Sequence, residues 1–260
     1  MSKKILISSF IYLFSYFSFA TTGQDVIDLV KKNNQNFSTE TNEMRLIIKE
    51  NNAVTAERKL KGKILEIENG SMINKSLLEF THPTDVKGTK LLTWLMENEE
   101  KSQWIYLPAL SKSKRILAGN ANASFMGSEF TYSDIGGEAA GRYTFTLKNE
   151  KKEGQDIVWT VEQRSKDNNE KEYKLLTVRK SLSTPEKMEY YNAKNEKYKE
   201  AILSGFKKYS VGKKILFRPS SVIMKNLINR NESVIEWDNR EFGAALNEKE
   251  FNAQALEKKR

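Results

Sequence analysis

Apolar and polar residues alternate along most of this chain, and no other sequence feature constrains its fold as strongly. The pattern is clearest over residues 44–49, 143–148 and 157–162, where every second residue is apolar. A period of two places successive side chains on opposite faces of a β-strand. The sequence therefore predicts a protein built mainly from strands that are buried on one face.

Further apolar runs extend the strand prediction over the rest of the chain. They cover 60–68, 76–81, 173–179, 187–191, 198–204, 220–227 and 234–237. Turn-forming residues separate them, namely Asn69-Gly70, Glu153-Gly154, Asp167-Asn168-Asn169 and Lys194-Asn195. Strands spaced about 8 to 15 residues apart favour hairpins in an antiparallel meander. No linker or repeat interrupts the pattern, so residues 21–260 are predicted to form a single domain.

One helix is predicted, at residues 22–34. Thr22 and Asp25 have the spacing of a capping box, in which the two side chains satisfy free backbone N–H groups at a helix start. Apolar residues follow at helical spacing over 26–30, and Asn33 and Asn34 end the pattern. This helix is expected to cover one side of the sheet.

The first 20 residues have the layout of an export signal. Lys3 and Lys4 precede an apolar run over residues 5–19, and Ser18-Phe19-Ala20 supplies small residues at a cleavage site. Cleavage after Ala20 would release residues 21–260 into the periplasm; an uncleaved N-terminal anchor is the alternative. The chain has no cysteine, so it has neither disulfides nor a lipid-modified cysteine at the cleavage site.

The chain is basic, with 43 lysines and arginines against 34 acidic residues. A basic surface can favour anionic lipid head groups, but these lysines are dispersed and are equally typical of a solvated surface. Nucleic acid is not expected as a partner, because the chain is predicted to be exported and contains no recognised nucleic-acid-binding motif.

Residues 91–137 combine many aromatic side chains with few groups that carry chemistry. Leu91–Met96 and Trp104–Leu107 are apolar on both faces, so each must be covered on both sides. A large curved sheet around a helical plug, with a cavity on one side, satisfies that requirement. The aromatic residues themselves fit either an ordinary core or a ligand site.

No enzyme is predicted. His82 is the only histidine and is interpreted as a turn residue before Pro83, and without cysteine it cannot complete a zinc site. Glu97, Glu99 and Glu100 are interpreted as solvated residues of a hairpin tip. No glycine-rich phosphate loop is present. The sequence therefore indicates no catalytic residue, no metal site and no cofactor.

The order of motifs in the middle of the chain resembles a known family. The motifs are Pro83–Thr89, Trp104–Leu110, Lys114–Ile116, Ser124–Phe130 and Tyr132–Asp134, and the C-terminal residues Phe242, Glu250, Phe251 and Leu256 also fit. They resemble the LolA-like outer-membrane lipoprotein-sorting proteins. That resemblance implies an unclosed antiparallel β-barrel, an α+β half-barrel covered by helices and enclosing an apolar cavity. It also implies binding of lipid or lipoprotein acyl chains without catalysis.

On this basis candidate sites are assigned to the aromatic region. The wall and lid candidates for lipid contact are Leu92, Trp94, Trp104, Tyr106, Phe125, Met126, Phe130 and Tyr132. The basic residues Lys112, Lys114 and Arg115 are candidates for a rim that contacts head groups, or alternatively for a solvated edge that blocks strand pairing. Residues 125–134 are expected to form the plug or lid.

The function expected from the resemblance is a monomeric periplasmic carrier that moves acyl chains of a lipoprotein or lipid towards the outer membrane. Its expected partners are an inner-membrane transporter or an outer-membrane receptor, with transient membrane contact. Alternatives are an accessory protein of a lipid-exporting pump with no stable cargo, a lipid hydrolase on the same scaffold, and a structural envelope protein.

Overall fold

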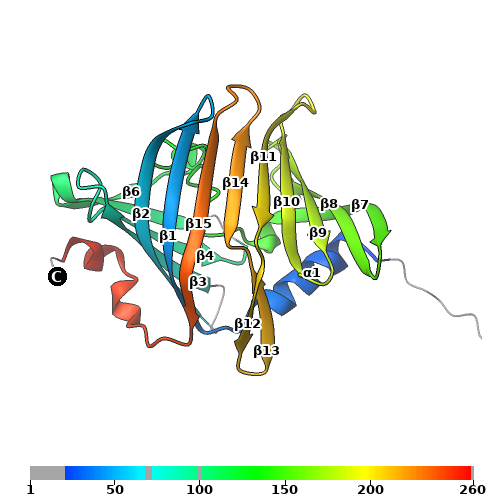
Figure 1. Cartoon of the computed structure of the whole chain (residues 1–260), viewed down its shortest axis with the longest axis horizontal. Coiled ribbons are helices and arrows are strands. Elements are labelled where there is room, and N and C mark those ends of the chain that lie inside the picture. Colours follow the sequence, from blue (N-terminus) through cyan, green and yellow to red (C-terminus); the bar gives the residue numbers. More distant parts are fainter. Residues whose placement is uncertain (1–20, 68–71, 99–100, 259–260) are drawn as a thin grey trace, which may run out of the picture.

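A computed structural model describes residues 21–67, 72–98 and 101–258. The predicted export signal, the Asn69-Gly70 turn, and Glu99 and Glu100 lie outside these residues. Within them the chain forms a curved antiparallel sheet with one α-helix packed near its edge (Figure 1). In the part of the chain that the structure describes, no helix is long and apolar enough to cross a membrane.

The strands follow the predicted alternation closely. They are β1 Thr39–Glu50, β2 Ala53–Glu66, β3 Met72–His82, β4 Lys90–Met96, β5 Ser102–Leu107, β6 Lys112–Ile116, β7 Tyr143–Glu153, β8 Asp156–Ser165, β9 Tyr173–Arg179, β10 Thr184–Tyr191, β11 Lys197–Ser204, β12 Lys207–Val211, β13 Lys214–Arg218, β14 Ser221–Asn226 and β15 Glu232–Phe242. All the predicted strands are present. The predicted meander is confirmed, because most sequence neighbours pair as antiparallel hairpins.

Thirteen of these strands form one sheet, in the order β6-β5-β4-β3-β2-β1-β15-β14-β11-β10-β9-β8-β7. The last strand, β15, returns to the middle of the sheet and pairs with β1. Strands β6 and β7 are its two edges and do not pair with each other, so the sheet is an unclosed half-barrel (Figure 1). The remaining strands, β12 and β13, form a separate hairpin.

The predicted helix is confirmed as α1, Gly23–Asn34. Thr22 and Asp25 form the capping box, with the Asp25 backbone N–H 3.1 Å from the Thr22 hydroxyl. Val26 and Ile27 are buried against Trp159, Val161 and neighbouring apolar residues of β8 and β9. The helix therefore covers one end of the half-barrel near the β7 edge, as Figure 1 shows.

Residues 117–142, here called the plug, connect one edge of the sheet to the other. They run from the end of β6 to the start of β7, so this segment must cross the concave side of the half-barrel. The prediction of a helical plug is wrong, whereas the predicted cover of helices is confirmed only for α1 among the described residues. The plug consists of turns with two short 3-10 helices, η2 Ala118–Asn120 and η3 Ala140–Arg142. Met126, Gly127, Gly136 and Gly137 have positive φ angles, which a helix excludes.

Strands β4 and β5 are covered on both faces, as their composition predicted. On the concave face, Leu91 belongs to the main core with Leu46, Leu60 and Phe80. On the convex face, the C-terminal segment packs against the sheet through η4 Glu248–Glu250 and η5 Ala253–Glu257. The plug and the C-terminal segment thus supply the two covers that the apolar strands need.

Candidate functional site: a cavity beneath the plug

A cavity of about 610 Å³ lies inside the half-barrel, partly open to solvent. Its volume falls within the range of roughly 300–1,000 Å³ that is typical of small-molecule sites. Apolar side chains from seven strands and the plug line most of it: Met44, Leu46, Leu60, Ile64, Leu78, Phe125, Phe130, Met188, Leu203, Val222, Met224, Ile235 and Trp237. Because each strand alternates, only its inward-facing residues reach the cavity.

The plug closes one side of this cavity through buried aromatic rings. Phe125 and Phe130 are 1% and 3% exposed and belong to the main core. The Phe125 ring lies 5.9 Å from the Phe80 ring and 5.5 Å from the Tyr132 ring. Two sheet side chains also bind the plug backbone. Arg58 on β2 donates to the Met126 carbonyl, and the Glu129 N–H donates to the Ser233 hydroxyl at 3.0 Å.

A buried carboxylate joins the plug to β10 and β11. Asp134 accepts hydrogen bonds from Lys199 at 2.7 Å and from the Tyr190 hydroxyl at 3.0 Å. The side chains of Asp134 and Lys199 are only 7% and 8% exposed. Burial opposes ionisation of Asp134, but Lys199 and Lys174 outweigh it and lower the pKa of that carboxyl. The plug is therefore attached to the sheet by an ion pair.

Glu138 makes a second attachment. It pairs with Lys174 on β9 and accepts a hydrogen bond from the Gln163 amide at 2.9 Å. Burial alone would raise the pKa of Glu138. The attraction of Lys174 and the hydrogen bonds from Lys174 and Gln163 together outweigh burial, so the pKa of Glu138 is lowered. The Glu138 side chain is nevertheless 28% exposed, because it borders the main cavity and a smaller one.

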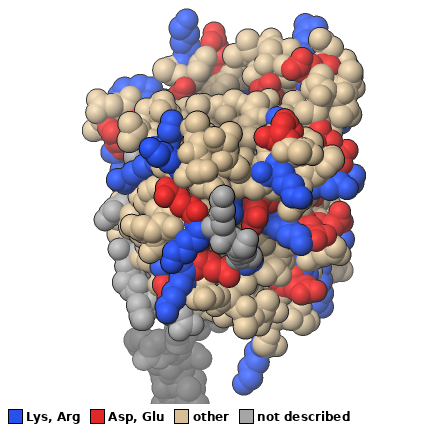
Figure 2. Space-filling model, turned by 90° about the vertical axis from the view of Figure 1, so that its left-hand side faces the viewer, with Lys and Arg blue, Asp and Glu red and all other residues tan. Residues whose placement is uncertain are grey.

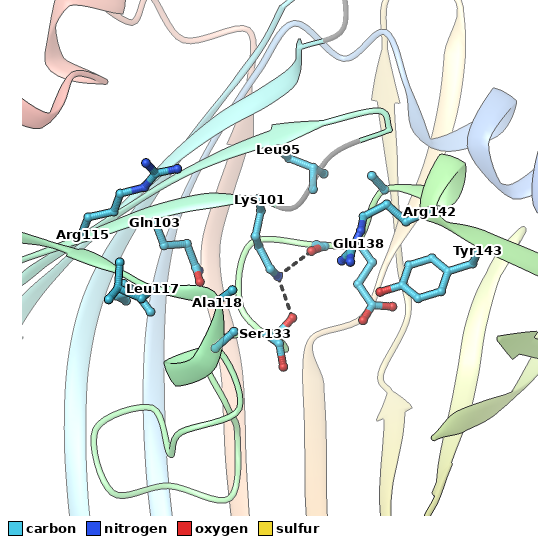
Figure 3. A pocket seen from close by; sticks show the side chains of 14 residues that line it. Leu95, Lys101, Gln103, Arg115, Leu117, Ala118, Ser133, Glu138, Arg142 and Tyr143 are labelled. Carbon is cyan, nitrogen blue, oxygen red and sulfur yellow. Dashed lines mark hydrogen bonds between the residues drawn. The ribbon is translucent and has the colours of Figure 1, made fainter. Parts of the chain in front are cut away.

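The smaller cavity, about 290 Å³, lies on the other side of the plug (Figure 3). Lys101 points into the plug from the start of β5 and donates to the carbonyl oxygens of Ser133, Ile135 and Gly137 at 2.6–2.8 Å. Burial lowers the pKa of Lys101 to about 8. All three ammonium protons are thus used to hold the plug backbone, and this cavity offers no free cation from Lys101.

One end of the main cavity is charged instead of apolar. Glu40 on β1, Arg218 on β13 and Arg240 on β15 all line it. The Glu40 and Arg240 side chains are each 4% exposed, and the Arg218 side chain is 15% exposed. Arginine and carboxylate groups are rarely buried without a partner. This end is therefore distinct from the apolar walls.

The outer surface shows no comparable concentration of charge on the face that Figure 2 presents. Basic and acidic side chains are interleaved there, over the side that carries the C-terminal segment. Lys63 pairs with Glu250 at 2.7 Å, and Lys75 pairs with Glu248 at the same distance. Such partly exposed pairs at the surface contribute little to stability. The dispersed lysines of the sequence thus form a solvated surface on this face.

Four of the predicted lipid-contact residues lie away from the cavity. Leu92, Trp94, Trp104 and Tyr106 project to the convex face and pack against Phe251 and Leu256. The Trp94 indole donates to the Phe251 carbonyl at 2.9 Å. The physical reason is strand alternation: on β4 the inward residues are Leu91, Thr93 and Leu95, so their neighbours face outwards.

The other predicted lipid-contact residues lie in the plug. Phe125 and Phe130 line the cavity. Met126 and Tyr132 are half-buried against the same core without reaching the cavity surface. The plug brings these four residues together on one side of the main core.

The predicted rim residues lie on β6, an edge strand of the sheet. Lys112, Lys114 and Arg115 are exposed there, which matches the alternative of a solvated edge. Arg115 alone borders a cavity, the smaller one, and it also stacks over Trp104 with its guanidinium carbon 5.8 Å from the ring centre. Lys112 and Lys114 line neither cavity.

The charged residues of the site were not predicted, although the sequence held a partial signal. Glu40 and Asn42 are in phase with Met44, Leu46 and Ile48 on the inward face of β1. Polar residues that continue an apolar face of a strand indicate either a strand end or a polar site. Lys199 continues the inward face of β11 beside Ala201 in the same way.

Comparisons with known proteins give one family match and several similar solved structures. Residues 73–258 match the model of a family that is described only as uncharacterized protein. No curated protein matches the chain. A proposed outer-membrane lipoprotein-sorting protein domain from Vibrio parahaemolyticus is similar, with a TM-score of 0.83 and 28% identity over 91% of this chain and 98% of that chain.

Two further structures share the fold. A DUF1329 family protein from Desulfovibrio piger has a TM-score of 0.81 and 23% identity, over 90% of this chain and 97% of that one. A LolA superfamily protein from Nitrosomonas europaea has a TM-score of 0.65 and 19% identity, over 90% and 98%. The alignment with this chain covers 97–98% of each of the three solved chains, so the structural resemblance extends to the whole half-barrel.

Proposed function

We propose that this chain, which belongs to the uncharacterized-protein family matched over residues 73–258, is a periplasmic carrier, because it is similar to a proposed outer-membrane lipoprotein-sorting protein domain. It binds acyl chains of a lipoprotein or lipid in the main cavity and moves them towards the outer membrane. The observation that carries this proposal is the cavity of about 610 Å³ with its largely apolar lining. We further propose that residues 21–260 act as one unit after cleavage of the export signal, without a catalytic step.

The size of the cavity sets the scale of binding. Each buried methylene contributes about 0.8 kcal/mol. A methylene occupies about as much space as a water molecule, roughly 30 Å³, so the cavity has room for about one long chain. Transfer to a membrane partner then requires that the partner, an inner-membrane transporter or an outer-membrane receptor, compete for that chain.

The test begins with protein purified, without detergent, from the periplasmic fraction of cells that express the full chain. Native mass spectrometry should detect bound acyl lipid, and the stripped protein should take up radiolabelled lipid from vesicles. Ala201 on β11 is fully buried and lines the cavity, so Ala201→Leu should fill part of it and reduce uptake several-fold.

Ile202→Met provides the matched control, because Ile202 is the next residue on β11 and does not line the cavity. Uptake by this variant should equal that of the wild type. Retention of the protein in the cytoplasm, or equal uptake by the Ala201 variant and the wild type, would contradict the carrier proposal. Recovery of a membrane pump without any lipid would favour the accessory-protein alternative.

A further inference from the structure

The charged end of the main cavity is assembled from segments far apart in the sequence. Arg240 Nε lies 2.9 Å from Glu40 Oε1, and Arg218 Nε lies 3.5 Å from Glu40 Oε2. Both guanidinium groups therefore share one carboxylate. Aromatic rings pack against them: Arg218 against Phe37 and Phe242, and Arg240 against Tyr209 and Trp237.

A β-bulge directs Arg240 into the cavity. Along β15, Ser233, Ile235 and Trp237 face inwards, and regular alternation would turn residue 240 outwards. The pairing of β15 with β1 shifts between Thr41 and Glu43, and Asn239 has a φ angle of 47°. The extra residue reverses the alternation, so Arg240 projects inwards beside Glu40.

The charges at this end do not balance. Two guanidinium groups face one carboxylate, and the next carboxylate, Glu66, is held by the backbone N–H groups of residues 36–38 at 2.6–2.9 Å. Burial lowers the pKa of Arg218 because it disfavours the charged guanidinium group. A further anion beside Arg218 would stabilise that charge.

Two polar atoms at this end also lack hydrogen-bond partners. Arg240 Nε is not aligned with Glu40 for a hydrogen bond, and the Asn42 side-chain oxygen accepts none. Both atoms are buried, and both residues line the cavity. Unsatisfied buried polar groups are costly, and an ionised acidic group, which accepts hydrogen bonds, would recover that cost at the Arg240 Nε donor.

We infer that the cavity binds a single-chain amphiphile with an acidic head group, held by Arg218 and Arg240. The head group is a carboxylate or a phosphate monoester, and both bind guanidinium groups through charge-assisted hydrogen bonds. The chain runs along the apolar wall formed by Met44, Leu46 and Ile235. This inference rests on the proposed carrier function and specifies its cargo.

The test compares three probes with the same chain: dodecanoate, dodecyl phosphate and the neutral dodecanol. Binding is followed by isothermal titration calorimetry and by the change in intrinsic tryptophan fluorescence, to which Trp237 beside Arg240 contributes. At least one acid should bind roughly 10- to 100-fold more tightly than the alcohol, which is the effect of one hydrogen bond to a charged group. The stronger of the two acids identifies the head group.

Arg218→Gln should reduce this preference to below about threefold, while Arg218→Lys should retain part of it because the charge remains. Arg45→Gln is the matched control, since Arg45 lies on β1, pairs with Glu236 and does not line the cavity. Circular dichroism confirms that each variant is folded. The wild-type comparison does not depend on any variant folding.

The outcomes separate the two proposals. If none of the probes binds, the carrier function itself fails. If the acids and the alcohol bind equally well, the carrier function stands and the assignment of an acidic head group is wrong. The assignment is also wrong if Arg218→Gln and Arg45→Gln keep the same preference for the acids.

Discussion

At the scale of single residues, Asp134 is the side chain that most directly attaches the plug. Asp134→Asn would leave Lys199, which is 8% exposed, without its counter-charge. Breaking a buried pair in this way costs about 3–5 kcal/mol. We expect a loss of that size in the free energy of unfolding at pH 7, measured by urea titration.

The pH dependence follows from the lowered pKa of Asp134. A carboxyl whose pKa is lower in the folded state adds stability above its ordinary pKa, about 3.8, and loses it as the pH falls through the folded value. The difference between wild type and Asp134→Asn should therefore be constant near neutral pH and shrink below about pH 4. A constant difference down to pH 2 would argue against this ion pair.

Lys101 should give a pH dependence of the same sign, but at higher pH. Its pKa is about 8 in the folded protein, so between pH 8 and the ordinary value of 10.5 the unfolded chain binds more protons and stability rises with pH. Lys101→Met leaves three plug carbonyls without donors, which costs about 1–3 kcal/mol at pH 7. The deficit of the variant should widen from pH 8 to 10 in urea titrations.

Aromatic density in the sequence located cavity-lining residues of the plug, but it did not show which face of a strand a residue occupies. Phe125 and Phe130 are candidates because of their density with other aromatic residues, and both line the cavity. Trp94 and Trp104 were assigned by aromatic density, which does not show which face of a strand a residue occupies. The inward position of Arg240 could not be predicted from the sequence, because the bulge that turns this residue inwards depends on the pairing of β15 with β1.

At the scale of elements, the C-terminal segment acts as a cover for the convex face. Phe251 is fully buried and packs with Leu92 and Tyr106. Phe251→Ala should lower the free energy of unfolding by about 3–5 kcal/mol while leaving lipid uptake per folded molecule unchanged. Thermal unfolding and uptake of radiolabelled lipid measure the two effects separately.

Phe125→Ala is the counterpart on the concave face, because Phe125 is equally buried but lines the cavity. It should lose comparable stability and also change lipid uptake. If Phe251→Ala changed lipid uptake as much as Phe125→Ala does, the convex face would take part in binding.

The elements that the sequence did not predict have a common cause. Strands β6 and β12 are rich in lysine and carry few apolar residues, and β13 is a short run with three consecutive apolar residues, so none of them shows a clear alternation. Their pairing comes from neighbouring strands and from short turns, as in the β12–β13 hairpin. Strands with a buried face were predictable, because burial imposes the alternation that the sequence shows.

At the scale of the whole molecule, the plug resembles a fixed wall more than a movable lid. It joins both edges of the sheet and contacts strands on every side, through Arg58, Lys101, Ser233, Lys174 and Lys199. The main cavity is partly open to solvent with the plug in place. We therefore expect a single chain to enter without displacing the plug.

A cross-link tests this directly, because the chain has no cysteine of its own. The Glu129 N–H lies 3.0 Å from the Ser233 hydroxyl, which limits the distance between their Cα atoms to about 7 Å, near the upper limit for a disulfide. Oxidised Glu129→Cys/Ser233→Cys protein should bind dodecanoate within twofold of its reduced form. If oxidation abolishes binding and reduction restores it, the plug must move for loading, and residues 117–142 are a lid.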